Sequence, residues 1–555
     1  MTSPRPAESA TTAEPQERLA RARGIGFWVG WAVLGLTLLI AAEFYLQHQT
    51  QFAIDSHSLM QIAYRARVLG ESYYVAGADL KGPLWIAPYD LAQRLGNFDT
   101  AWWFVAAILI AVSCTTGLFV YKIGARGGAS RWGAAAAAAA LTMWLLFSTE
   151  EYSFSLYSRN WLSLLFAGCF AALFTLPGAS RRRQLGLAAL AGACAGVAVQ
   201  TNASSATSAL LAFGLVVWLS LRGRALRDRV GPFPVLIAVF AGAAAIAFAS
   251  VFGWYAIHGD LGEFWSYWWT YSRDYANGPG LPWPKVFEKG YNDFAAYYRA
   301  RPIIPLAVAV FACDAVRRRR AGEPIWMDVT LLLWFVSELV VVTVSQRFWM
   351  HYLILPLVPA GAMAAVFAAR WAGRLSLRTQ HLLPLALGFC ALYFGGWANA
   401  GFGLDRARDF QSVSTTLQLD HQTIAPDKQA VRQNVLRFAK AGSWAIVWTV
   451  TPFEYNEFNL RSATRYVPRV WLSGEMPGAA ADPASVPPRW WHRFWQDLRQ
   501  TPPALLVYRL DSPPPADGVF GHFLRCAFRE RWTDQGWTIR QRIKPVDACL
   551  APKRA

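Results

Sequence analysis

The chain has 555 residues, of which 54% are hydrophobic, only 16% are charged and 27 are tryptophans. This composition is too apolar for an ordinary soluble protein and indicates a membrane protein. In a soluble protein the formal net charge of +18 would suggest a nucleic-acid partner. Here much of that charge lies in short loops between apolar segments, where it meets anionic lipid headgroups. We therefore expect membrane lipids, and no nucleic acid, as partners.

The N-terminal residues 1–23 are polar and rich in Pro, Ala and Thr, which predicts a disordered cytoplasmic tail. Behind them we predict eleven membrane helices, because apolar segments recur that can cross a hydrocarbon core of about 30 Å. They lie near residues 24–46, 101–121, 132–147, 160–176, 185–200, 204–221, 230–257, 302–316, 325–344, 350–369 and 382–400. The first is too long for the core of a signal peptide, and we expect it to remain as a helix.

The basic residues give the orientation, because short cytoplasmic loops retain Lys and Arg. If the N-terminus is cytoplasmic, all the strongly basic loops fall on the cytoplasmic side. The arginine runs 181–183 and 317–320 are the clearest examples. The loops 47–100 and 258–301, and the residues after 402, then face the other side.

The first outer loop carries the main candidates for chemistry. Asp55 follows the first apolar segment, where a partly desolvated carboxylate can act as a general base on a hydroxyl; the alternative is a solvated aspartate. Residues 57–70 have apolar positions at helical spacing, which predicts an interfacial helix that ends at its last glycine. Asp79 and Lys81 come next. Lys81 either snorkels to the interface or offsets the charge on a leaving phosphate.

Further candidates lie in later outer loops. Glu150 and Glu151 are either acids of a cavity or solvated loop residues. Glu338 lies inside an apolar segment, where an ionisable group is costly; it either lines a cavity or is a neutral, hydrogen-bonded glutamate between helices. The aromatic side chains of loop 258–301 form either an interfacial belt or contacts to sugar and lipid. The candidates for such contacts are Trp265, Trp268 and Tyr271.

Residues 403–555 have the pattern of a compact α/β domain outside the membrane. The sequence predicts helices at 427–442 and 489–503, and strands at 443–450, 504–510 and 537–543. Cys526 and Cys549 are the two cysteines of this part. An oxidising compartment would allow them to pair, and the sequence leaves that question open.

Three stretches together resemble the GT-C class of membrane glycosyltransferases. The first runs from Asp55 through a helix, a glycine and aromatic residues to "DLKGPL" at 79–84. The second is "RFWMHYLILP" at 347–356, and the third is "AGSWAIVWTVTPFEYNEFNLRSATRYVP" at 441–468. The likeness is greatest to bacterial relatives of protein O-mannosyltransferases and of aminoarabinose-lipid A transferases. It implies a GT-C transmembrane domain at 24–402 in a bacterial inner membrane, followed by a periplasmic or extracellular domain.

The resemblance also implies roles for single residues. Asp55 would be the catalytic carboxylate, and Lys81, Arg347 and His351 would approach the phosphate of a polyprenyl-phosphate sugar. Tyr352 adjoins these as a contact to sugar or lipid. Many relatives have Asp-Glu where this chain has Asp55-Ser56, so we expect no obligatory metal. Some members of the class use a divalent metal ion and others do not.

The function expected is inverting transfer of a sugar to a lipid, polysaccharide or protein of the cell envelope. The alternative from another class is a multipass transporter or lipid flippase, and a third is a scaffold for envelope assembly. Carriers place ionisable residues at mid-membrane in broken helices. Here nearly all the candidates lie in outer loops, which favours the enzyme.

Overall fold

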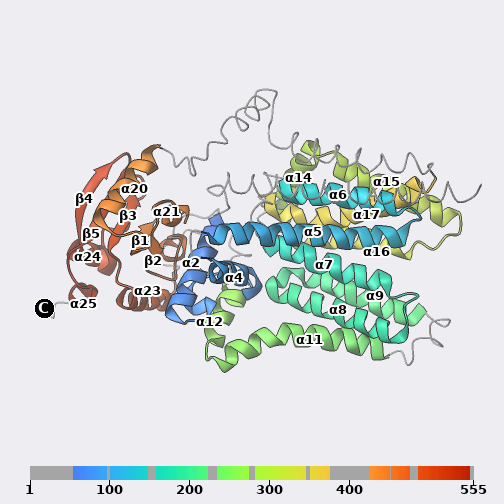
Figure 1. Cartoon of the computed structure of the whole chain (residues 1–555), viewed down its shortest axis with the longest axis horizontal. Coiled ribbons are helices and arrows are strands. Elements are labelled where there is room, and N and C mark those ends of the chain that lie inside the picture. Colours follow the sequence, from blue (N-terminus) through green and yellow to red (C-terminus); the bar gives the residue numbers. More distant parts are fainter. Residues whose placement is uncertain are drawn as a thin grey trace, which may run out of the picture. The chain divides into compact units, whose positions relative to one another are not determined.

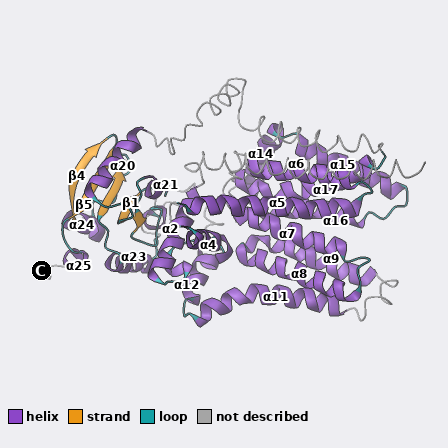
Figure 2. Cartoon of the chain, viewed as in Figure 1, coloured by secondary structure: helices purple, strands orange, loops and turns teal. Residues whose placement is uncertain are grey.

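The computed structural model describes ten stretches of the chain, all of which belong to one compact unit, Gln49–Ala555. The described residues are 54–79, 81–96, 100–147, 158–222, 234–273, 282–344, 350–374, 426–450, 452–474 and 486–550. Most of them form helices, and the C-terminal part contains a small sheet (Figures 1 and 2). The fold class predicted from the sequence, a helical polytopic membrane protein with a C-terminal α/β part, is therefore confirmed.

Long apolar helices run side by side in one bundle (Figure 1). They are α5 (Ala101–Gly127), α6 (Arg131–Phe147), α7 (Ser158–Thr175), α8 (Arg181–Thr201), α9 (Ala206–Arg222), α11 (Pro234–Ile257), α15 (Ile303–Arg320), α16 (Trp326–Val344) and α17 (Ile354–Ala372). Among the described residues six segments are long and apolar enough to cross a membrane, and they lie in α5, α8, η3 with α9, α11, α16 and α17.

The other helices of the bundle occupy predicted segments but are shorter or more polar. Helix α6 has 17 residues, α7 begins with the polar Ser158, Arg159 and Asn160, and α15 ends in four arginines. The predicted segments 24–46 and 382–400 lie outside the described residues. The number eleven therefore stays a prediction.

Small residues bring the helices of the bundle into close contact. A Cβ atom at Gly192 of α8 would lie 2.1 Å from the carbonyl oxygen of Phe240 in α11, and one at Gly196 would lie 2.2 Å from that of Ala244. Such glycines, four residues apart, let two helix backbones approach where lipid gives no hydrophobic driving force. Side chains fill the rest of the bundle, as where Phe170 stacks on Trp334 with ring centroids 4.4 Å apart.

The loop 47–100, which the sequence predicts to face outward, forms short helices where the structure describes it. They are α2 (Ile54–Leu69), α3 (Tyr73–Ala76), η2 (Pro83–Trp85) and α4 (Ala87–Leu95). The predicted helix is confirmed, while its position at the membrane interface stays a prediction. It ends before Gly70, whose φ of 68° suits glycine. It begins three residues earlier than the sequence indicated, so Asp55 lies in its first turn. Its polar side chains Gln61 and Arg65 are fully buried, because the C-terminal part packs on it.

The second long loop, 258–301, is also predicted to face outward and is also helical where the structure describes it. It contains α12 (Leu261–Trp265), the π-helical turn η4 (Ser266–Tyr271) and α14 (Trp283–Ala300). Aromatic side chains of α11, α12 and η4 pack on one another, as in the parallel stack of Tyr255 and Phe264 at 4.7 Å.

The C-terminal part is a mixed sheet with strand order β2-β1-β3-β5-β4. Strand β1 (Trp444–Trp448) pairs in parallel with β2 (Arg461–Ser462) and β3 (Leu505–Arg509), while β5 (Trp537–Arg542) is antiparallel to β3 and to β4 (Phe528–Asp534). Its helices are α20 (Pro426–Phe438), α21 (Phe453–Glu457), α22 (Val470–Ser473), α23 (Pro488–Gln500), α24 (Gly518–Ala527) and α25 (Val546–Leu550).

All five elements predicted in this part are confirmed, and six further elements were not predicted: β2, β4, α21, α22, α24 and α25. Strand β4 is a largely exposed edge strand with the sequence FRERWTD, so it lacks the apolar signal of a buried strand. Strand β2 has only two residues, the helices α21, α22 and α25 have only four or five each, and α24 follows a loop rich in proline. A disulfide between Cys526 and Cys549 joins α24 to α25, with Cα atoms 5.6 Å apart, which answers the question that the sequence left open.

Candidate active site

Asp55 stands in the first turn of α2, half-buried, next to the contacts that fix the start of this helix. The hydroxyl of Tyr89 in α4 donates a hydrogen bond of 2.9 Å to the hydroxyl oxygen of the adjacent Ser56. Burial raises the pKa of the Asp55 carboxyl above its ordinary value, and the positive charge of Lys81 partly offsets this increase. The base and the cation predicted from the sequence are thus electrostatically coupled.

Lys81 is buried although it is a lysine, and its ammonium lies 5.3 Å from the centre of the Trp85 ring. Its backbone is held from two sides. The amide donates to Asp79 Oδ1 at 2.9 Å, and the hydroxyl of Tyr74 donates to the carbonyl oxygen. Asp79, a predicted cavity acid, therefore shapes the turn that presents the Lys81 side chain.

The loop that follows Lys81 is hydrogen-bonded to the C-terminal end of the membrane span α8. Gly82 donates its amide hydrogen to the Thr201 carbonyl at 2.9 Å. A Cβ at Gly82 would lie 2.4 Å from the backbone oxygen of Gln200, so only glycine fits without moving the loop. Trp268 donates from Nε1 to the same Gln200 oxygen at 2.7 Å. The sequence placed Lys81 and Trp268 in separate outer loops, and the structure brings both to the end of α8.

The aromatic candidates occupy different environments. Trp268 is buried. Its Nε1 is held by the hydrogen bond to Gln200, and its ring stacks on Phe264. Tyr271 packs against Trp471 of the C-terminal part, with ring centroids 4.5 Å apart. Trp265 remains 44% exposed, so among the three it is the side chain best placed to meet lipid or sugar.

A buried cation that the sequence analysis did not select lies at the start of α7. The guanidinium carbon of Arg159 lies 4.0 Å from the ring centre of Tyr352, and the Arg159 side chain is 2% exposed. Its Nε and Nη1 atoms have no hydrogen-bond partner among the residues that the structure describes. The sequence does carry a signal for it: with a cytoplasmic N-terminus, Arg159 falls in an outer loop, where the charge rule disfavours arginine.

Glu338 of α16 is a buried acidic residue inside the bundle. Its Oε1 accepts hydrogen bonds from the Ser208 hydroxyl of α9 at 2.8 Å and from Trp334 Nε1 at 2.9 Å. The charge of Arg159 also acts on it. Glu338 is therefore hydrogen-bonded between helices and, at the same time, electrostatically coupled to a cation at the bundle end.

The remaining predicted site residues are not placed by the structure. Arg347, Glu150 and Glu151 lie outside the described residues, and of His351 only the backbone, in η5 (Met350–Leu353), is described. Their roles stay predictions. In the described part of the chain, no group of three or more His, Cys, Asp or Glu side chains could hold a metal ion.

The helix that carries Asp55 is fixed from the C-terminal part by buried polar contacts. Arg65 of α2 donates from Nε to the Ala76 carbonyl at 3.0 Å and from Nη1 to the Ser462 carbonyl at 3.2 Å. Gln61 accepts a hydrogen bond from the Ser462 amide at 3.0 Å. His57, two residues from Asp55, contacts Asn456 of α21. The C-terminal part thereby holds three successive turns of α2.

Comparisons with known proteins show which known fold the chain resembles. No protein-family profile and no curated protein match the chain. The crystal structure of ArnT from Cupriavidus metallidurans bound to undecaprenyl phosphate is similar, with a TM-score of 0.52 and 16% identity over 93% of this chain and 99% of that chain. The apo structure of the same protein gives a TM-score of 0.53 and 15% identity over 95% of this chain and 99% of that one. The chain therefore has an ArnT-like fold, the GT-C fold predicted from its sequence.

Proposed function

We propose that the protein is an inverting glycosyltransferase that moves a sugar from a polyprenyl-phosphate donor to an acceptor of the cell envelope on the extracytoplasmic face. The observation that carries this proposal is the coupling of a half-buried carboxylate, Asp55, to a buried ammonium, Lys81, beside the end of a membrane span. The fold supports it, because ArnT, the similar protein, was solved with undecaprenyl phosphate bound.

The donor phosphate would be bound by cations from distant parts of the chain. Lys81 presents a buried ammonium, and Arg159 has two guanidinium nitrogens without a partner among the described residues. Arginine suits this role because its donors form a fixed fork that matches phosphate oxygens. Arg347 and His351 remain further candidates from the sequence, and the polyprenyl chain would lie along the apolar helices.

The chemistry then needs one carboxylate. Asp55 accepts the proton of an acceptor hydroxyl while the hydroxyl oxygen forms a bond to the anomeric carbon, on the face opposite the phosphate. The bond between this carbon and the phosphate oxygen breaks, and polyprenyl phosphate leaves with the electron pair. The cations compensate its charge in a partly desolvated site. Because phosphate leaves as an anion, no second carboxyl is needed as general acid, unlike in glycoside hydrolases.

The proposed location is a bacterial inner membrane, with a cytoplasmic N-terminus and the C-terminal part outside. The Cys526–Cys549 disulfide supports this orientation, because disulfides persist in oxidising compartments. The proposed reaction requires no metal.

The second candidate is a transporter or lipid flippase, and one observation favours it. Glu338 is an ionisable residue inside the membrane span α16, and such residues often mark transport pathways. Yet Ser208 and Trp334 already bind it, whereas Asp55 and Lys81 lie outside the spans. We therefore rank the enzyme first.

The experiment is a turnover assay on the full-length protein in phospholipid nanodiscs. A panel of undecaprenyl-phosphate sugars is offered with a cell-envelope extract as acceptor, and the products are followed by mass spectrometry. The proposal predicts that one donor is consumed and that undecaprenyl phosphate appears in equal amount. In a parallel assay with the protein in closed phospholipid vesicles, movement of donors across the bilayer without consumption of any would instead support the flippase.

A further inference from the structure

The carbonyl groups at the C-terminal end of α8 are bound by two segments that lie far apart in the sequence. The last carbonyls of a helix have no partner within it. In α8 the Gln200 oxygen accepts a hydrogen bond from Trp268 Nε1 at 2.7 Å, and the next oxygen, that of Thr201, accepts one from the Gly82 amide at 2.9 Å. The helix end therefore joins the π-helical turn η4 to the loop that carries Lys81.

The Gln200 oxygen is in contact with both of these segments. A Cβ atom at Gly82 would lie 2.4 Å from it, so the backbone of Gly82 packs directly on the oxygen that Trp268 binds. Gly82 follows Lys81 in the chain, and both Gln200 and Lys81 are buried, with 1% and 8% of their surface exposed. A shift of this oxygen would therefore move the backbone next to Lys81.

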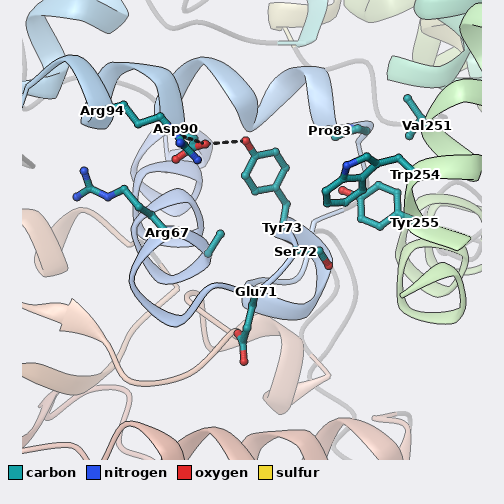
Figure 3. Close-up of a pocket in the computed structure, with 11 residues that line it drawn as sticks. Arg67, Glu71, Ser72, Tyr73, Pro83, Asp90, Arg94, Val251, Trp254 and Tyr255 are labelled. Atoms are coloured by element: carbon teal, nitrogen blue, oxygen red, sulfur yellow. Dashed lines mark hydrogen bonds and ion pairs between the residues drawn. The ribbon is translucent and has the colours of Figure 1, made fainter. Parts of the chain in front are cut away.

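The other side of the loop is less tightly packed. Pro83, the residue after Gly82, lines a pocket of about 340 Å³, whose lining also includes Val251, Trp254 and Tyr255 of α11 (Figure 3). This pocket leaves space into which the loop could shift. The contacts of the loop with the end of α8 oppose such a shift.

Trp268 is itself held in one position. It is 4% exposed, Phe264 stacks on its ring with centroids 5.7 Å apart, and Phe252 of α11 meets it edge-to-face at 5.3 Å. Its turn is bonded to the C-terminal part, where Arg489 donates to Ser266 Oγ at 2.7 Å. An indole fixed in this way can hold the end of α8, whereas it offers little of its surface to a ligand.

Burial alone does not require this hydrogen bond. Trp144 of α6 is 7% exposed, and its Nε1 has no partner among the residues that the structure describes. The fold therefore accommodates a buried indole without such a bond. The bond of Trp268 then has a local purpose, which is to fix the helix end on which Gly82 packs.

We propose that Trp268 is a positioning residue for Lys81. Through the Gln200 carbonyl it holds the loop that presents the Lys81 ammonium to the phosphate of the donor. The donor phosphate as ligand rests on the proposed function, whereas the placement of Lys81 does not. Trp268 contacts neither the donor nor the reacting atoms in this scheme and acts only through Lys81.

Chemical labelling tests the placement of Lys81 without any ligand. The full-length protein in nanodiscs is treated briefly with an amine-reactive reagent, and modification is followed by mass spectrometry. We expect Trp268→Phe, which removes the donor, to raise the labelling rate of Lys81 several-fold, while the exposed Lys289 is labelled as before. Trp144→Phe removes the same ring atoms without breaking a hydrogen bond and should leave both rates unchanged. Equal Lys81 rates in the two variants would overturn the proposal.

A double-mutant cycle tests whether Trp268 acts through Lys81. The affinity for undecaprenyl phosphate is measured by isothermal titration. We expect Trp268→Phe to weaken binding roughly 2- to 10-fold in the unchanged chain and to have no further effect in Lys81→Gln, because changes that act on one contact are not additive. If Lys81→Gln weakens binding and the loss from Trp268→Phe adds to it in full, the proposal is wrong.

The proposed function can fail while the positioning holds. If Lys81→Gln binds undecaprenyl phosphate as tightly as the unchanged chain, while Trp268→Phe makes Lys81 accessible to the reagent, the proposed donor site fails and the positioning stands. If Trp268→Phe does not fold, benzothienylalanine at position 268 replaces the indole N–H by sulfur in a ring of similar size. It then takes the place of Trp268→Phe in both measurements, with the same expected results.

Discussion

The guanidinium of Arg65 lies 3.5 Å from the carboxylate of Asp497, and both side chains are almost completely buried. Asp497 also receives the backbone amide of Arg465 at 2.9 Å and the Arg465 guanidinium at 2.9 Å. One carboxylate thus compensates two buried arginines, one on the helix that begins at Asp55 and one in the C-terminal part. Arg65 precedes Asp497 by more than 400 positions in the sequence, and their contact joins the candidate site to the sheet region.

We expect Asp497→Asn to destabilise the protein by about 3–5 kcal/mol, because removal of one partner leaves buried charges uncompensated. The measurement is the thermal unfolding midpoint in detergent. The control is Asp547→Asn, which breaks the Arg499–Asp547 pair where Asp547 is 77% exposed, and surface changes of this kind stay within about 0.5 kcal/mol. Similar midpoints for the two variants would show that the buried pair does not hold α2.

The pH dependence of transfer should report Asp55. A general base is active when ionised, and burial raises the pKa of this carboxyl while Lys81 lowers it. Activity therefore falls as the pH decreases through the raised pKa. Lys81→Gln removes the opposing charge, so we expect the acid limb of the pH–rate profile to move to higher pH. Lys289→Gln, at an exposed lysine of α14, should leave the profile in place. If the acid limb stayed at the same pH in Lys81→Gln, the charge of Lys81 would not act on the Asp55 carboxyl, and the prediction would be wrong.

Arg159 should contribute to binding of the donor phosphate. We expect Arg159→Gln to weaken binding of undecaprenyl phosphate by about 10-fold or more, because a hydrogen bond to a charged group contributes roughly 1.5–3 kcal/mol. Isothermal titration with undecaprenyl phosphate measures this, and the unfolding midpoint shows whether the bundle has suffered. Arg299→Gln, at an exposed position of α14, is the matched control. Unchanged affinity in a folded Arg159→Gln protein would assign Arg159 to packing against Tyr352.

The sequence predicted what depends on local pattern. Apolar segments located the helices of the bundle, and alternating strand and helix patterns located β1, β3 and β5 with α20 and α23. The helix behind Asp55 and its glycine terminus followed from apolar spacing and from the conformation that glycine adopts.

What the sequence did not predict depends on contacts between distant segments. Residues 57–70 read as an interfacial helix, yet Arg65 is fully buried because Asp497 and Ser462 satisfy it. In the sequence Arg159 is one of several loop arginines, and what distinguishes it is its burial over Tyr352. Asp90 of α4 and Tyr255 of α11 line the same pocket, although no sequence motif connects them. A buried charge destabilises the fold unless it is paired, and a local sequence pattern does not identify its partners.

The role of Asp55 is tested most directly by the rate of sugar transfer in the Asp55→Asn protein. This change keeps the size of the side chain and removes the base. We expect the rate to fall about 100- to 10,000-fold, with undecaprenyl-phosphate binding and the unfolding midpoint retained, whereas Asp511→Asn, at an exposed aspartate, keeps full activity. An Asp55→Asn protein that transfers sugar as fast as the unchanged chain would contradict the account.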